Sequence, residues 1–313
     1  MTALDHKPNL FIIGAMKSGT TSLHEYLSTH PAIGMSQVKE PGYFAEELTW
    51  HRGEAWYLGL FPQNGPYRYR GESSTQYTML PTFQGVAPRL HRFNPHARLL
   101  YIMRNPFERT LSHYWHNVRV RNPREGGGEP RSLRQAVREQ PRYLAYSDYA
   151  TQLTPYVELF GRDALYALTF ESLVANPQQE LDRIYRWLDL PPHPLGEHGS
   201  RAHNQKPAQL TVAAGRGLLY RIRFSRTWHR LSPWVPSGLK RFAQRKAERP
   251  IDERQLEQER TLLKQDIGDL QRQQVERLSK LLGRGFPEWH PIASTSDDGG
   301  AARDGLRTPH DHA

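Results

Sequence analysis

Residues 14–22, with the sequence GAMKSGTTS, contain the groups that an anion-binding loop needs. Gly14 and Gly19 are separated by four residues, and Lys17 lies between them. Glycines let successive backbone N–H groups converge on one ligand at the start of a helix, and the lysine adds positive charge. The chemistry that this segment indicates is the binding of a small anionic group.

The glycine spacing is similar to the GxxxxGK[ST] pattern of nucleoside triphosphatases, with one departure. Thr20 follows Gly19 at the position where that pattern has a lysine. In those enzymes this lysine holds the β- and γ-phosphates and the next hydroxyl holds magnesium. The loop therefore favours a donor with a shorter anionic chain that needs no metal. A glycine turn without a ligand is the alternative, and the three hydroxyls that follow Gly19 count against it.

Buried strands and amphipathic helices alternate around this loop. Three strand–helix pairs are predicted: 10–13 with 20–30, 98–104 with 107–120, and 165–170 with 178–188. This alternation predicts an α/β fold, in which a parallel sheet carrying the phosphate loop is flanked by helices on both faces. We also expect a loop at 122–131, one or two helices within 252–283, and a disordered tail at 293–313.

Composition narrows the class of protein. Lys and Arg number 42 against 32 Asp and Glu, so the net charge of +10 favours anionic partners without choosing among them. The absence of cysteine excludes disulfides, thiolate metal sites and cysteine nucleophiles. No apolar run approaches the length of a membrane span, and the first residues do not match a secretory signal. These features predict a cytoplasmic enzyme.

Two ordered motifs resemble those of a known family. The run IIGAMKSGTTSLHEYLSTHP is similar to the 5′-phosphosulfate-binding segment of sulfotransferases that use 3′-phosphoadenosine-5′-phosphosulfate (PAPS). The run LLYIMRNPFERTLSHYW is similar to their 3′-phosphate-binding segment. VKEPGYF and RGESSTQY resemble segments of the heparan-sulfate-modifying branch and its bacterial relatives. The resemblance covers about residues 9–292, which implies a sulfotransferase-like fold.

The resemblance also implies roles for individual residues. The 5′-phosphosulfate would be held by Lys17, Ser18, Gly19, Thr20, Thr21 and Ser22. Arg104 and Ser112 would hold the 3′-phosphate. Glu40 would be the general base, with Lys17 as the second catalytic residue. Lys206, in the polar segment 201–207, would lie in a loop that covers the donor.

One position departs from the family pattern. The family often has Lys after the Glu of its Glu-Lys-Ser/Thr strand, and this chain has Ser73 after Glu72. Either Lys39 or another base supplies the missing charge, or the acceptor site differs. Glu72 is expected to orient Lys17 or a loop, and we interpret His113 and His116, which belong to no visible ligand set, as structural.

The resulting hypothesis is a bacterial sulfotransferase that needs no metal and releases adenosine 3′,5′-bisphosphate. Its acceptor would be a hydroxyl or amine of a carbohydrate-like or small molecule, such as a glycan or another anionic compound. A P-loop phosphotransferase and a non-catalytic polyanion-binding protein remain as alternatives. We expect one domain over 8–292, no nucleic-acid partner and no transmembrane segment, and the oligomeric state stays open.

The domain is predicted to contain a basic, aromatic-rich insertion at about 208–250. Its residues 220–249 contain nine Lys or Arg against one acidic residue. This composition is typical of a solvated amphipathic helix pair, of a lid over the acceptor, or of a surface that contacts anionic lipid at the membrane periphery.

Overall fold

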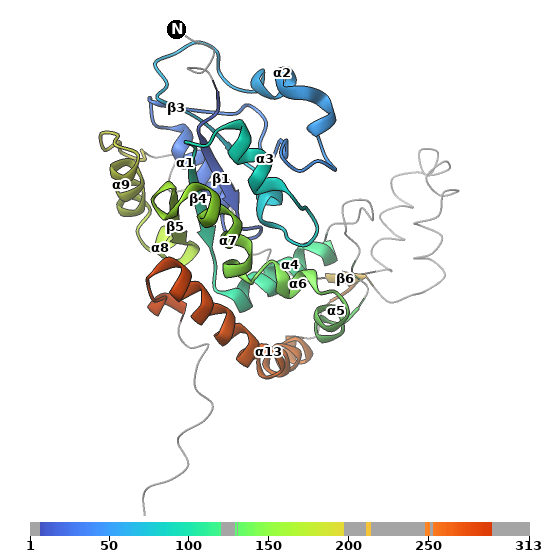
Figure 1. Ribbon diagram of the computed structural model, residues 1–313. Helices are drawn as coiled ribbons and strands as arrows, with labels where there is room; N and C mark the ends of the chain where they lie inside the picture. Colours follow the sequence, from blue (N-terminus) through green and yellow to red (C-terminus); the bar gives the residue numbers. More distant parts are fainter. Residues whose placement is uncertain are drawn as a thin grey trace, which may run out of the picture.

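The computed structural model describes residues 7–119, 129, 131–196, 211–213, 248–250 and 253–289. A five-stranded parallel sheet with the strand order β2-β3-β1-β4-β5 forms its centre (Figure 1). The strands are β1 (Leu10–Gly14), β2 (Ile33–Met35), β3 (Tyr69–Ser73), β4 (Arg98–Met103) and β5 (Leu165–Thr169). The predicted parallel sheet is confirmed, and the three strands predicted from apolar runs end within one residue of their predicted ends.

Helices cover both faces of the sheet, as the sequence predicted. They are α1 (Thr20–Ser28), α2 (Gly53–Leu58), α3 (Val86–Phe93), α4 (Pro106–Arg119), α5 (Leu133–Glu139), α6 (Arg142–Ala145), α7 (Tyr149–Phe160), α8 (Phe170–Ala175), α9 (Pro177–Trp187) and α13 (Glu253–Leu282). Short 3-10 helices are η2 (Trp50–Arg52), η3 (Thr75–Thr78), η5 (Arg162–Ala164) and η8 (Pro287–Trp289).

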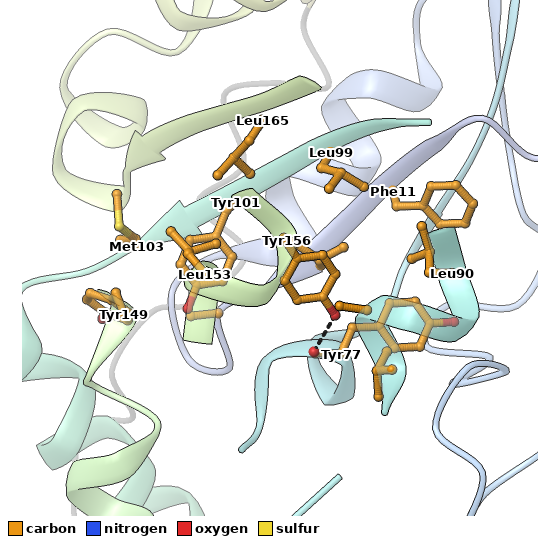
Figure 2. Packing of buried hydrophobic residues seen from close by; sticks show 14 of the residues in the cluster. Phe11, Tyr77, Leu90, Leu99, Tyr101, Met103, Tyr149, Leu153, Tyr156 and Leu165 are labelled. Carbon is orange, nitrogen blue, oxygen red and sulfur yellow. Dashed lines mark hydrogen bonds between the residues drawn. The ribbon is translucent and has the colours of Figure 1, made fainter. Parts of the chain in front are cut away.

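Alternating side chains of the central strands divide the core into two layers. Leu99 and Tyr101 of β4 pack against α3 and α7, in the cluster that Figure 2 shows from close by. Leu100 and Ile102 point to the opposite face and pack against α1 and α9. A central parallel strand is apolar on both sides because helices cover both of its faces, which explains the continuous apolar run of β4.

The predicted helical region at 252–283 forms one helix, α13, which packs along one side of the domain (Figure 1). Its first half contributes Leu263 and Ile267 to a third apolar cluster with α4 and α5. Its last turns contribute Leu278 and Leu282 to the layer that contains α7. The helix therefore contacts two separate parts of the core.

Several predicted segments fall outside the described residues. The tail 293–313, the segment 220–247 and nearly all of the predicted loop 122–131 belong to this group. Two short strands, β6 (Thr211–Ala213) and β7 (Glu248–Pro250), pair antiparallel and bring residues near the two ends of the basic segment together. Among the described helices, none combines the length and apolar character required to cross a membrane.

Candidate active site

The glycine loop connects β1 to α1 at the carboxyl end of the sheet. Both glycines are fixed by close packing. A Cβ on Gly14 would lie 2.0 Å from Oγ1 of Thr78, and one on Gly19 would lie 2.7 Å from the ring of Phe170. Gly19 also has a φ of 96°, in the left-handed region that glycine tolerates best. The loop conformation thus requires glycine at both positions of the predicted motif.

The start of α1 presents unpaired backbone donors. The N–H groups of Thr20, Thr21 and Ser22 bond to no backbone carbonyl among the described residues. No acidic side chain lies in the first turn to neutralise them. Unpaired N–H groups and the positive end of the helix dipole together attract an anion. These residues fit a phosphate or phosphosulfate group.

Lys17 lies in the middle of the loop and is partly buried. Its φ of 67° is left-handed, a conformation that a lysine seldom adopts. Ser18, the next residue, is completely buried. The loop therefore turns sharply at Lys17 before it enters the helix. Such positions are found at ligand-binding turns.

Arg104 directly follows β4, the strand beside β1. The hydroxyl of Tyr149 donates a hydrogen bond of 2.6 Å to its carbonyl oxygen, which fixes its backbone. Its guanidinium lies 5.2 Å from the centre of the Phe170 ring, the same ring that contacts Gly19. Phe170 thus links the loop and the arginine that the sequence predicted as two parts of one site.

Ser112 lies on α4, eight residues after Arg104. Residues four apart share a helix face, so Glu108 and Ser112 lie on one side of α4. Glu108 forms ion pairs with Arg104 (3.5 Å) and with Arg260 of α13 (2.6 Å). Ser112 therefore lies on the face of α4 whose Glu108 pairs with Arg104. Arg260 of α13 adds a second guanidinium on that face.

Glu40 lies in the segment after β2, with a left-handed φ of 60°. Its backbone N–H donates to the carbonyl of Ser73, at 2.9 Å. Its carboxylate accepts hydrogen bonds from Nζ of Lys39 (2.6 Å) and Nε2 of Gln76 (3.2 Å). Because β3 lies between β2 and β1, Glu40 and the glycine loop lie at the same edge of the sheet, where ligands of open α/β sheets bind.

Ser73 occupies the position where the resemblance led us to expect lysine. It is completely buried, and its hydroxyl bonds to none of the described residues. Lys39, which pairs with Glu40, lies close to α1: burial first, and then the charge of Lys39, lower the pKa of His24 to about 4. A cation is thus present beside Glu40, although not on β3.

Glu72 is the acidic residue that sequence reasoning assigned least clearly. It is completely buried at the end of β3. Burial raises its pKa to about 7, against hydrogen bonds from three hydroxyls that lower it. Those hydroxyls come from Ser74 and Tyr77, which follow Glu72 closely in the sequence, and from Tyr57, which lies on another element. No sequence pattern identifies such a set, although two tyrosines near one acidic strand end are a weak indication.

His113 occupies a buried position on α4. Nη1 of Arg109 lies 3.4 Å from Nδ1 of His113, and both side chains are almost completely buried. Burial first, then the charges of Arg109 and other cations, lower the pKa of His113 to about 2. The ring is therefore neutral at physiological pH. Lys206 lies outside the described residues, so its predicted role stays a prediction.

Groups of three or more His, Asp or Glu side chains that could hold a metal ion do not occur in the described ranges. The chemistry of the site rests on cations such as Lys17 and Arg104, on backbone donors, and on the carboxylates of Glu40 and Glu72. Such a set can bind an anionic donor and accept a proton from a nucleophile. It defines a P-loop α/β protein with the groups of a group-transfer enzyme.

Comparison with known proteins identifies the family. Residues 7–207, more than half of the chain, match the family described as "Sulfotransferase domain", and the protein belongs to this family. The "Bifunctional heparan sulfate N-deacetylase/N-sulfotransferase 1" of Caenorhabditis elegans is 28% identical over 199 residues, covering 60% of this chain and 23% of that protein. The "Heparan sulfate glucosamine 3-O-sulfotransferase 6" of Mus musculus is 28% identical over 192 residues, covering 58% and 52%.

The chain thus spans about a quarter to a half of the length of these relatives. A sulfotransferase from Alicyclobacillus acidocaldarius has a similar structure, with a TM-score of 0.62 and 24% identity over 90% of this chain and 98% of that one. This likeness confirms the sulfotransferase fold. The family match and the fold agree with the family that the motifs predicted.

Proposed function

We propose that this protein is a sulfotransferase that takes its sulfuryl group from PAPS and transfers it to a hydroxyl or amine of an acceptor. The observation that carries the proposal is the shared ring of Phe170. It contacts Gly19 of the glycine loop and lies 5.2 Å from Arg104, so the candidate sites for the two ends of the donor adjoin one residue. A donor with one anionic group at its 5′ end and another at its 3′ position needs such an arrangement.

The donor's 5′ end would be held by Lys17 and by the backbone and hydroxyls of Ser18, Gly19, Thr20, Thr21 and Ser22. The unpaired N–H groups at the start of α1 support this assignment. The 3′-phosphate would bind Arg104, whose planar guanidinium suits two phosphate oxygens, and Ser112 as a neutral donor. When bound, PAPS supplies the sulfuryl group and leaves as adenosine 3′,5′-bisphosphate.

Glu40 would act as the general base. The acceptor loses a proton as its oxygen or nitrogen bonds to sulfur, and the Glu40 carboxylate would take that proton. Lys39 would hold the carboxylate in place through its bond of 2.6 Å, and it would supply the positive charge that Ser73 cannot. Lys17 would balance the charge that develops on the leaving oxygen, a task that requires no metal for a sulfuryl group.

A carbohydrate is the acceptor class that the relatives favour. Both named relatives act on heparan sulfate, and one sulfates nitrogen while the other sulfates oxygen. We therefore propose a glycan-type hydroxyl or amine as the acceptor. We place the transferase domain at residues 8–292, because α13 contributes core residues to the sheet layer.

Ligand-induced thermal stabilisation tests the proposal. Adenosine 3′,5′-bisphosphate is expected to raise the melting temperature by much more than AMP or ATP does. A second assay is expected to detect sulfate transfer from PAPS to desulfated heparin fragments. Stabilisation by ATP with magnesium alone would instead support a phosphotransferase. Stabilisation by heparin alone, weakening with salt, would support a polyanion-binding protein.

A further inference from the structure

Glu72 is completely buried at the end of β3, where three hydroxyl groups bind its carboxylate. Its carboxylate accepts hydrogen bonds from Tyr57 (2.8 Å), Tyr77 (2.5 Å) and Ser74 (2.6 Å). Within the described residues, no lysine, arginine or histidine nitrogen lies within 4.0 Å of it. A buried carboxylate without a cation is costly, so its presence needs a reason other than stability.

Two of the three hydroxyls also bind the segment that follows Glu40. Oγ of Ser74 accepts a hydrogen bond from the N–H of Gly42 at 3.0 Å. The hydroxyl of Tyr77 accepts one from the N–H of Phe44 at 3.4 Å. Each hydroxyl therefore lies between the carboxylate and the backbone of the Glu40 segment.

Above a pH of about 7, where Glu72 is ionised, its carboxylate sets the direction of both hydroxyls. An ionised carboxylate only accepts hydrogen bonds, so each hydroxyl must point its single proton at Glu72. The oxygen lone pairs of the two hydroxyls are then available to accept hydrogen bonds from the N–H groups of Gly42 and Phe44. With an amide or an apolar group in place of the carboxylate, the two hydroxyls would no longer have to point their protons toward residue 72.

The Glu40 segment needs this support because its backbone is strained. Glu40 and Gly42 both have left-handed φ values, 60° and 63°. For glutamate this conformation is unfavourable and persists only where neighbouring contacts enforce it. The bond from the Glu40 N–H to the Ser73 carbonyl and the two hydroxyl bonds supply that enforcement.

We propose that Glu72 is a positioning residue, which acts through Ser74 and Tyr77 to hold Glu40 where it can take the acceptor's proton. The proposal rests on the proposed function, in which Glu40 is the general base. Misplacement of a catalytic group by about 1 Å can reduce turnover by about 10²-fold. We therefore expect Glu72→Gln to lower kcat by about 10- to 100-fold and leave the Kd for adenosine 3′,5′-bisphosphate within about threefold.

The decisive experiment is a double-mutant cycle of Glu40→Gln and Glu72→Gln, with kcat measured at saturating PAPS. If Glu72 acts through Glu40, adding Glu72→Gln to Glu40→Gln changes kcat by less than about twofold, because coupled residues are not additive. Independent, multiplying losses would overturn the positioning role. Failure of the proposed function looks different, since Glu40→Gln alone would then leave kcat unchanged.

Tyr77→Phe and Ser74→Ala repeat the test in variants that keep the carboxylate, which matters if Glu72→Gln does not fold. Each is expected to lower kcat without weakening donor binding. Tyr69→Phe is the matched control, because Tyr69 lies buried on the same strand and donates its hydroxyl to the carbonyl of Leu188 instead. Equal kcat losses in Tyr69→Phe and Tyr77→Phe would show general destabilisation and overturn the proposal.

Discussion

Substitution of Glu72 by glutamine should change how the stability of the protein depends on pH. Burial raises the pKa of Glu72 from 4.5 to about 7 in the folded protein. Between these values the unfolded chain has lost the proton and the folded chain keeps it, so stability falls as pH rises. Each pH unit of this difference corresponds to about 1.4 kcal/mol, which gives about 3 kcal/mol in total.

Glutamine cannot ionise, so Glu72→Gln lacks this loss. The unfolding free energy of the variant, relative to the wild type, should rise by about 3 kcal/mol between about pH 4.5 and pH 8. Any effect of altered hydrogen bonding is constant with pH and cancels in the comparison. The lowered pKa values of His24 and His113 act in the opposite direction, since their stabilisation is lost as pH falls below 6.5. The wild type and Glu72→Gln share that loss, so it cancels when their unfolding free energies are subtracted.

Urea denaturation at a series of pH values measures the effect. Both proteins are unfolded at each pH, and the difference between their unfolding free energies is plotted against pH. A difference that stays constant within about 0.5 kcal/mol would refute the reasoning, because it would mean that Glu72 titrates alike in the folded and unfolded chains.

Four further predictions concern the site. Glu40→Gln should lower kcat by about 10²- to 10⁴-fold in a transfer assay with unchanged donor binding, the usual contribution of a positioned base; a loss below about tenfold would place the base elsewhere. Adenosine 3′,5′-bisphosphate at about 100 times its Kd should add about 2.7 kcal/mol of stability, more than AMP adds. Arg104→Ala should reduce this difference between the two ligands in calorimetry; equal shifts with both ligands in the wild type would contradict the assignment of Arg104 to the 3′-phosphate. Gly19→Ala should weaken donor binding by at least about tenfold in titration calorimetry, because its Cβ would lie 2.7 Å from Phe170, whereas Gly268→Ala in open space should not; equal affinities would argue against the loop. Transfer activity should persist in EDTA, since a sulfuryl group needs less countercharge than a phosphoryl group; activity restored only by magnesium would favour a phosphotransferase.

The sequence predicted the parts of the fold that have a local pattern. Strands β1 and β4 carry apolar runs because they are buried on both faces, and the edge strand β5 places Leu165 and Leu168 in the two core layers. The glycine spacing identifies the loop. The edge strand β2 has three residues, too few to show a period. Such an element is specified by pairing with β3, which local sequence does not reveal.

The candidate site was predictable only where motifs are contiguous. The loop and the Arg104 segment each lie within one run of sequence. Phe170, which links them, comes from the start of α8, and the sequence marks it only as the end of a strand. The environment of Glu72 is likewise assembled from two tyrosines on different elements, so its raised pKa follows from tertiary packing alone.

The last described part of the chain, α13 and η8, affects where this protein can be divided. The family match stops at residue 207, yet Trp289 packs in the core, donates from its indole to Glu171, and offers its carbonyl to Asn105 beside Arg104. A fragment cut at the family boundary would leave an open apolar strip on α7 and an unsupported turn beside Arg104. For expression, or for transplanting the transferase into a fusion protein, the smallest usable unit therefore runs through residue 289, and the sequence between the family match and α13 must be carried along.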